Sequence, residues 1–160
     1  MPFGQFLDDI VYPSQSASGG VPKGYLAQHN LCDQAFKLKR DFYLPDYVMV
    51  ETGRRQPTGI DGFNTDEVQV NAWLGPRGTI SPLHFDQYDN LFAQVAGYKH
   101  IRLYAPSESA NLYPYPAESL VSNTSQVDVL NPDLNRFARF SRASHLECIV
   151  GPGDLLYIPV

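Results

Sequence analysis

Proline and glycine interrupt this chain so often that little room remains for long helices. Of its 160 residues, 13 are Pro and 12 are Gly, and the segments between them are rich in Val, Ile, Tyr and Phe. Branched and aromatic side chains suit the pleated surface of a strand, whereas Pro and Gly suit turns. The pattern predicts a mainly β structure, an all-β barrel or sandwich, about one domain in size.

Alternation of apolar and polar side chains marks the segments that we expect to form strands. They are residues 47–51, 68–74, 79–86, 91–96, 99–104, 146–150 and 155–159. We expect residues 91–104 to form a hairpin that turns at Ala96 and Gly97, and residues 151–154 to form a second turn. Such short connections favour antiparallel pairing.

Two short helices are expected outside the sheet, over residues 31–40 and 132–139. Each follows an asparagine that can cap a helix, Asn30 or Asn131. The composition of residues 13–22 predicts a loop.

The charge balance excludes some kinds of partner. Lys and Arg number 12 and Asp and Glu number 17, a net charge of −5, and no basic run occurs, so we expect no direct nucleic-acid binding and a basic partner instead. No apolar stretch approaches the roughly 20 residues of a membrane span, and no signal peptide is recognisable. We expect an intracellular protein, nuclear or cytoplasmic, without membrane contact. Cys32 and Cys148 indicate neither a disulfide framework nor a structural zinc site.

His84 and Asp86 stand two residues apart, in His84-Phe85-Asp86. In a strand such positions project to the same face, so the imidazole and the carboxylate can converge on one metal ion. They are two donors of a 2-His-1-carboxylate set, which suits Fe(II) because three positions stay open for a cosubstrate and oxygen. The same tripeptide is compatible with a hydrogen-bonded histidine at a strand end and a carboxylate that caps a turn.

Lys99 follows the expected turn and, in a regular strand, shares its face with Ile101 and Leu103. An ammonium group on the face of core side chains favours an anionic ligand, such as a dicarboxylate. Alternatively, the lysine lies at the strand end and its stem extends to water.

Longer runs around these residues resemble the JmjC (jumonji C) oxygenase family. They are residues 71–84 (NAWLGPRGTISPLH), Asp86, Asn90, residues 97–99 (GYK) and 101–104 (IRLY). Residues 24–29 (GYLAQH), 45–47 (PDY), 123–128 (NTSQVD) and 131–134 (NPDL) resemble one branch, which contains arginyl hydroxylases and lysine demethylases. From about residue 24 the resemblance covers nearly the whole chain.

The resemblance implies a double-stranded β-helix, a cupin-like jelly-roll barrel with a few flanking helices, that holds Fe(II) and 2-oxoglutarate. By matched position, His84 and Asp86 resemble catalytic iron ligands, and Lys99 resembles the lysine that pairs with the distal carboxylate of 2-oxoglutarate. Further positions match the lining of the cosubstrate pocket: Tyr25, Ser81, Asn90, Trp73 and Gln28. Without the resemblance, we would expect Tyr25 to be a core side chain and Ser81 and Asn90 to be turn residues, while Trp73 fits core packing and a pocket role equally well.

The family carries a third iron ligand, a histidine a few residues beyond a strand like residues 155–160, and this chain stops at Val160. His29, His100 and His145 do not align with that ligand. The resemblance therefore implies a fragment, truncated at both ends. Residues 1–23 are then a flanking helix and loop, and residues 24–160 a partial JmjC domain that lacks its C-terminal strand or strands.

For the complete protein the resemblance implies a protein hydroxylase that depends on Fe(II) and 2-oxoglutarate. Its outcome is arginyl hydroxylation or methyl-lysine demethylation, on a protein or peptide such as a histone or a ribosomal protein. Two alternatives stay open: a non-catalytic cupin-like binding module, and a metal cupin that is not an oxygenase, in which Lys99 meets no dicarboxylate.

Overall fold

The computed structural model describes residues 1–13, 24–50 and 68–160. These fall into two compact units, which we call the first unit, up to Ser81, and the second unit, from Pro82 to Val160. Apart from Pro13, the loop predicted at 13–22 lies outside the described residues, as does the last residue of the strand predicted at 47–51.

The first unit contains short helices and one small sheet. Its elements are α1 (Phe3–Phe6), a π-helical turn (Leu7–Val11), β1 (Leu26–His29), α2 (Leu31–Gln34), two 3₁₀ helices (Phe36–Arg40 and Asp46–Met49) and β2 (Ala72–Leu74). β1 pairs with β2 in antiparallel fashion, with Leu26 opposite Leu74 and His29 opposite Ala72. The register shifts between these pairs, where Gln28 adopts a positive φ of 49°. This geometry is that of a β-bulge.

Several local predictions in the first unit are wrong. The strand predicted at 47–51 is a 3₁₀ helix, Asp46–Met49, which begins directly after Pro45. The helix predicted over 31–40 breaks at Ala35, whose ψ of 67° is not helical. Asn30 makes no side-chain cap bond, so its side chain does not add the stabilisation that an N-cap gives to a helix. β1 was not predicted, and of residues 68–74 only Ala72–Leu74 form a strand.

The second unit is built on four strands with nested pairing. They are β3 (Asn90–Ala93), β4 (Lys99–Tyr104), β5 (His145–Val150) and β6 (Leu155–Ile158). β4 pairs with β5 and β3 pairs with β6, both antiparallel, in two separate sheets. An inner pair enclosed by an outer pair is the pattern of one long hairpin folded across two sheets, as in jelly rolls.

The hairpin predicted within 91–104 is wrong, because β3 and β4 belong to different sheets. The bend at Ala96 and Gly97 is a corner between sheets, and Gly97 permits it with a φ of 73°. The turn predicted at 151–154 is confirmed by the Asp154 N–H bond to the Gly151 carbonyl, 3.0 Å. This turn lies beside the end of β3, since Gln94, the next residue, exchanges backbone hydrogen bonds with Gly153 and Asp154.

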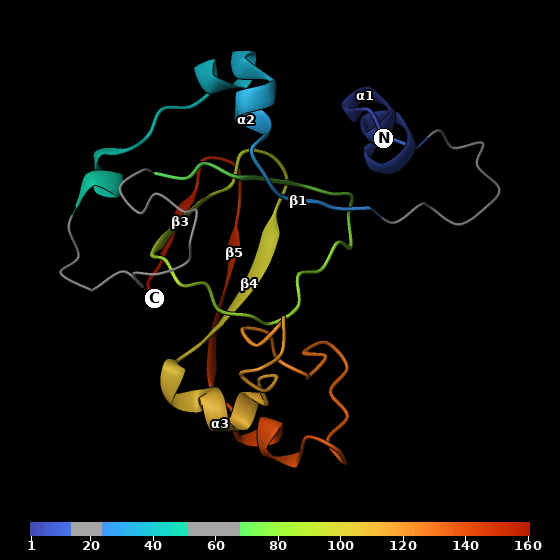
Figure 1. Cartoon of the computed structure of the whole chain (residues 1–160), viewed down its shortest axis with the longest axis vertical. Helices are drawn as coiled ribbons and strands as arrows, with labels where there is room; N and C mark the ends of the chain where they lie inside the picture. The colour runs from blue at the N-terminus through green and yellow to red at the C-terminus, as the bar shows by residue number, and fades with distance from the viewer. Residues whose placement is uncertain (14–23, 51–67) are drawn as a thin grey trace. The chain divides into compact units, whose positions relative to one another are not determined.

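The chain between β4 and β5 forms an irregular cap, residues 105–144, beyond the end of these two strands (Figure 1). It contains 3₁₀ helices Pro106–Glu108 and Ala138–Arg142 and α3 (Ser109–Leu112). Its core is formed by Val127 and Phe137, which expose 4% and 6%. The Phe137 ring packs edge-on against Tyr113, with centroids 5.0 Å apart.

The helix predicted at 132–139 is a turn followed by the 3₁₀ helix. The Asp133 carboxylate accepts the N–H groups of Asn135 and Arg136, at 3.1 and 3.3 Å, and so stabilises the turn that competes with a helix.

The expectation of a mainly β structure is confirmed, and the strands predicted at 99–104, 146–150 and 155–159 agree with β4, β5 and β6 to within one residue. In the described parts of the chain these strands do not close into a barrel. Within the same parts, no helix has the length and apolar character needed to cross a membrane. Cys32 and Cys148 are unpaired by disulfides.

Candidate metal and cosubstrate site

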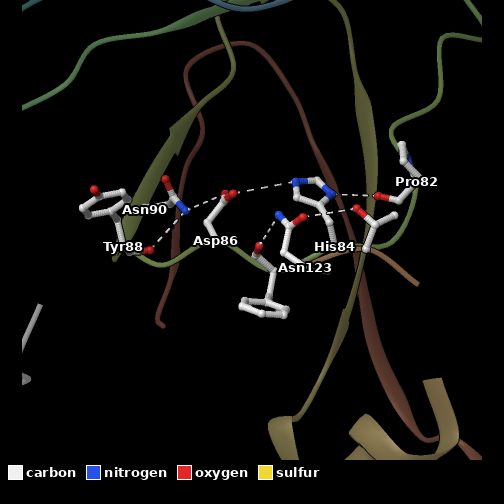
Figure 2. Close-up of polar contacts among 8 residues, drawn as sticks. Pro82, His84, Asp86, Tyr88, Asn90 and Asn123 are labelled. Carbon is white, nitrogen blue, oxygen red and sulfur yellow. Dashed lines mark hydrogen bonds and ion pairs between the residues drawn. The ribbon is translucent and has the colours of Figure 1, made fainter. Parts of the chain in front are cut away.

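His84 and Asp86 face each other across a short gap in the second unit (Figure 2). His84 Nε2 lies 4.0 Å from Asp86 Oδ1. The strand predicted over 79–86 is wrong, since only His84 forms a bridge there, with Thr124. The two side chains nevertheless point to the same place, and both are accessible to solvent, with 40% and 53% of their surfaces exposed.

The imidazole of His84 is oriented by Pro82. His84 Nδ1 lies 2.7 Å from the Pro82 carbonyl oxygen. Because a carbonyl only accepts, Nδ1 carries the proton, which leaves the lone pair of a neutral ring on Nε2. Histidines that bind metals typically use one ring nitrogen for the ion and donate the other N–H to a carbonyl or carboxylate. His84 has this arrangement.

The carboxylate of Asp86 is held through its other oxygen. Asn90 Nδ2 donates to Asp86 Oδ2 at 3.0 Å and to the Tyr88 carbonyl at 3.2 Å. Both amide protons of Asn90 therefore have acceptors, which defines the orientation of the side chain. Asp86 Oδ1 is left facing His84, as Figure 2 shows.

The gap between the two donors is somewhat wider than the separation of neighbouring ligands on one metal ion. At 4.0 Å it is too long for a direct hydrogen bond. Imidazole nitrogen and carboxylate oxygen each bind zinc-like ions at about 2.0–2.2 Å, so two donors at right angles on one ion lie about 3 Å apart, and these side chains would close by about 1 Å to share an ion. Within the described residues no group of three His, Cys, Asp or Glu side chains is arranged to hold a metal. Among the described residues, His84 and Asp86 therefore bring two possible metal donors together without a third.

A short segment, Asn123–Ser125, is hydrogen-bonded to the backbone of residues 83–85, which carries His84. His84 pairs with Thr124 as an antiparallel bridge, and the Ser125 N–H donates to the Leu83 carbonyl at 2.8 Å. Phe85 bonds Asn123 through its N–H and through its carbonyl, each at 3.0 Å. Sequence reasoning gave no role to Asn123, because no local spacing connects it to His84.

The Lys99 side chain extends from β4 toward the face of β3 that carries Asn90 and Phe92. The register places Lys99 opposite Val150, on the face that also carries Ile101 and Leu103, as alternation predicts. Its Nζ lies 5.0 Å from the centroid of the Phe92 ring. Phe92 shares its strand face with Asn90, two residues before it. The ammonium group is therefore directed toward the strand face that begins beside Asp86.

Four other predicted site residues belong to the first unit: Tyr25, Gln28, Trp73 and Ser81. Gln28 lies in the bulge of β1, and Trp73 in β2 exposes 45% of its surface. The Tyr25 ring packs so closely on Gly75 that a Cβ there would lie 2.9 Å from its Cδ2. The predicted pocket role of these four residues stays a prediction.

The opposite face of the β4–β5 sheet carries a charged cluster that sequence reasoning did not identify. His100 Nε2 and Arg102 Nε lie 3.0 and 3.3 Å from Glu147 Oε2, and His145 Nε2 lies 3.7 Å from the same oxygen. The hydrogen bond from His100, assisted by Arg102, holds the pKa of the Glu147 carboxyl below its ordinary value. His100 points away from Lys99, as its position in the strand predicts.

Comparison with known proteins places this geometry in context. The cupin-like domain family matches residues 1–160. Lysine-specific demethylase 8 of Danio rerio is 50% identical over 137 residues, which cover 86% of this chain and 31% of that protein. JmjC domain-containing protein D of Dictyostelium discoideum is 40% identical over 98% of the chain and 35% of its own length. Lysine-specific demethylase JMJ30 of Arabidopsis thaliana is 39% identical over 98% of the chain and 33% of its own length. The chain thus spans about a third of the curated relatives that it matches.

Proposed function

The chain belongs to the cupin-like domain family, and from this premise we propose that it forms the iron and cosubstrate end of a 2-oxoglutarate-dependent protein hydroxylase or demethylase. The observation that carries the proposal is the pair His84 and Asp86, whose donor atoms face each other at 4.0 Å with their other polar atoms already bonded. Relatives named as lysine demethylases and JmjC proteins support it.

In this proposal, the candidate site residues of the second unit have the following roles. His84 Nε2 and Asp86 Oδ1 hold Fe(II), while Pro82 and Asn90 keep the two side chains oriented. Lys99 holds the distal carboxylate of 2-oxoglutarate through a charge-assisted hydrogen bond. When bound, iron and 2-oxoglutarate would supply, with O₂ as the oxidant, the chemistry that hydroxylates a carbon–hydrogen bond of the substrate while 2-oxoglutarate is oxidised to succinate and CO₂. For Tyr25, Gln28, Trp73 and Ser81 of the first unit, the proposed role in cosubstrate binding rests on the family resemblance alone.

We propose a basic segment of a protein as the substrate, bearing methyl-lysine or arginine. The relatives named as lysine-specific demethylases favour methyl-lysine. The excess of acidic side chains in this chain, 17 against 12 basic ones, favours a basic peptide of either kind.

A non-catalytic binding module is the second candidate. The observation that favours it is the donor count, since the described residues bring only two metal donors together. A cupin-like module of this kind would keep a peptide site and would not consume 2-oxoglutarate.

The deciding experiment measures the conversion of 2-oxoglutarate to succinate by the full-length protein. We expect the double substitution His84→Ala, Asp86→Ala to abolish iron-dependent turnover. His100→Ala is the matched control, because this histidine lies on the opposite sheet face and should leave turnover unchanged. Turnover that survives the double substitution excludes His84 and Asp86 as the iron ligands, and a wild-type protein without turnover favours the binding module.

A further inference from the structure

Phe85, between the two candidate metal ligands, has both of its backbone polar groups bonded by one residue. Its N–H donates to the Asn123 carbonyl oxygen at 3.0 Å. Its own carbonyl accepts the side-chain amide of Asn123, also at 3.0 Å (Figure 2). The N–H of Phe85 belongs to the peptide group that follows His84, and the carbonyl belongs to the one that precedes Asp86. Asn123 therefore holds both peptide planes between the two donors.

The chemistry of this contact requires an amide side chain. The Phe85 carbonyl only accepts hydrogen bonds, so Asn123 must present its NH₂ group. Its Oδ1 then faces the Thr124 hydroxyl, which donates to it at 3.4 Å. A carboxylate of the same size has no proton to offer at neutral pH, and a shorter side chain does not reach.

The segment that carries Asn123 is itself well anchored in the cap. Ser125 exposes only 9% of its surface, and its hydroxyl donates to the Leu112 carbonyl at 2.5 Å. The same hydroxyl oxygen accepts the N–H of Val127 at 3.0 Å, and Val127 exposes 4%. Asn123 thus connects the buried core of the cap to the backbone of the metal site.

We propose that Asn123 is a positioning residue for the metal site, one that sets the spacing of His84 and Asp86 through the two peptide groups of Phe85. The inference rests on the proposed role of these two side chains as metal ligands. Donor groups must be held within about 0.5 Å of their working positions. Outer partners that orient metal ligands typically change metal affinity by about 10–100-fold.

The test measures Mn²⁺ affinity of the full-length protein by calorimetry, with the electron paramagnetic resonance spectrum of the bound ion as a second readout. We expect Asn123→Ala to weaken Mn²⁺ binding by roughly tenfold and to speed backbone hydrogen exchange in residues 82–88. Gln126→Ala is the matched control, because the Gln126 amide, just beyond the segment Asn123–Ser125, also donates to a backbone carbonyl, that of Pro114 at 3.1 Å. We expect it to leave Mn²⁺ affinity unchanged.

A second variant covers the case in which Asn123→Ala does not fold. Asn123→Leu keeps nearly the volume and the backbone bond and loses the donor without adding a charge, and it should weaken Mn²⁺ binding to a similar extent. His84→Ala distinguishes a wrong positioning role of Asn123 from a wrong metal site. If it abolishes Mn²⁺ binding while both Asn123 variants bind like the wild type, the positioning role is wrong and the metal site stands. If wild-type protein binds no Mn²⁺, the metal site itself is wrong.

Discussion

Asn90 bonds one oxygen of the Asp86 carboxylate at 3.0 Å and leaves the other oxygen facing His84. The carboxylate can therefore not rotate freely, although it is exposed to solvent. A ligand that is held in its binding rotamer loses less conformational entropy when the metal arrives.

This contact makes Asn90→Ala a test of the Asp86 side chain. Without its amide partner we expect the carboxylate to sample other rotamers and Mn²⁺ affinity, measured by calorimetry in the absence of 2-oxoglutarate, to fall by about tenfold. Asn111→Ala is the control, because the Asn111 amide bonds the Glu108 carboxylate at 2.8 Å in the cap. Equal Mn²⁺ affinities in the two variants would show that Asp86 needs no support from Asn90.

The lowered pKa of the Glu147 carboxyl makes the stability of the fold depend on pH. Its pKa is held below the ordinary 4.5, first by the hydrogen bond from His100 and further by Arg102, against an opposing effect of desolvation. A carboxyl whose pKa is lower in the folded state stabilises the fold above its unfolded pKa, and this contribution disappears as the pH falls through the folded value.

We therefore expect unfolding midpoints in urea to drop as the pH falls below about 4.5, and to drop less in Glu147→Gln. Glu118→Gln, at an exposed position of the cap, should follow the wild-type curve. If the wild type and Glu147→Gln lose stability in parallel, the lowered pKa of Glu147 does not contribute to acid unfolding.

Sequence patterns succeeded where structure is local. β4 and β5 agree with their predicted ranges because alternation of side chains over five or six residues carries the strand signal by itself. The corner at Ala96 and Gly97 shows the limit of that signal. A glycine with a positive φ bends a chain equally well within one hairpin and between two sheets, so only the long-range pairing with β5 and β6 decides.

The candidate site divides along the same line. The spacing of His84 and Asp86 predicts two metal donors, and the resemblance to JmjC oxygenases adds Asn90 and Lys99 as predicted site residues. The convergence of the donors does not come from a regular strand, however, since residues 79–86 form only one bridge. It depends on Asn123, 38 residues beyond Phe85, and no local pattern connects positions that far apart.

The buried Phe137 ring offers a test of how much the core of the cap contributes to stability. Its ring exposes 6% of its surface and packs on Tyr113, so Phe137→Ala removes a nearly buried aromatic side chain. We expect the free energy of unfolding, measured in urea, to fall by about 3 kcal/mol. Leu120→Ala is the control, because the Leu120 side chain is fully exposed and should change stability little. A small loss for Phe137→Ala would mean that the cap core contributes little to the fold.

Lys99 gives the sharpest test of the cosubstrate. Lys99→Met keeps the apolar stem beside Phe92 and removes the charge, so we expect the affinity of the Mn²⁺-loaded protein for 2-oxoglutarate to fall by about 10–100-fold. Mn²⁺ affinity without 2-oxoglutarate should not change, since Lys99 supplies no metal donor. Lys37→Met, in the 3₁₀ helix Phe36–Arg40, controls for the loss of one positive charge. If both variants bind 2-oxoglutarate like the wild type, Lys99 does not hold the dicarboxylate, and a metal cupin without this cosubstrate becomes the better explanation of the fold.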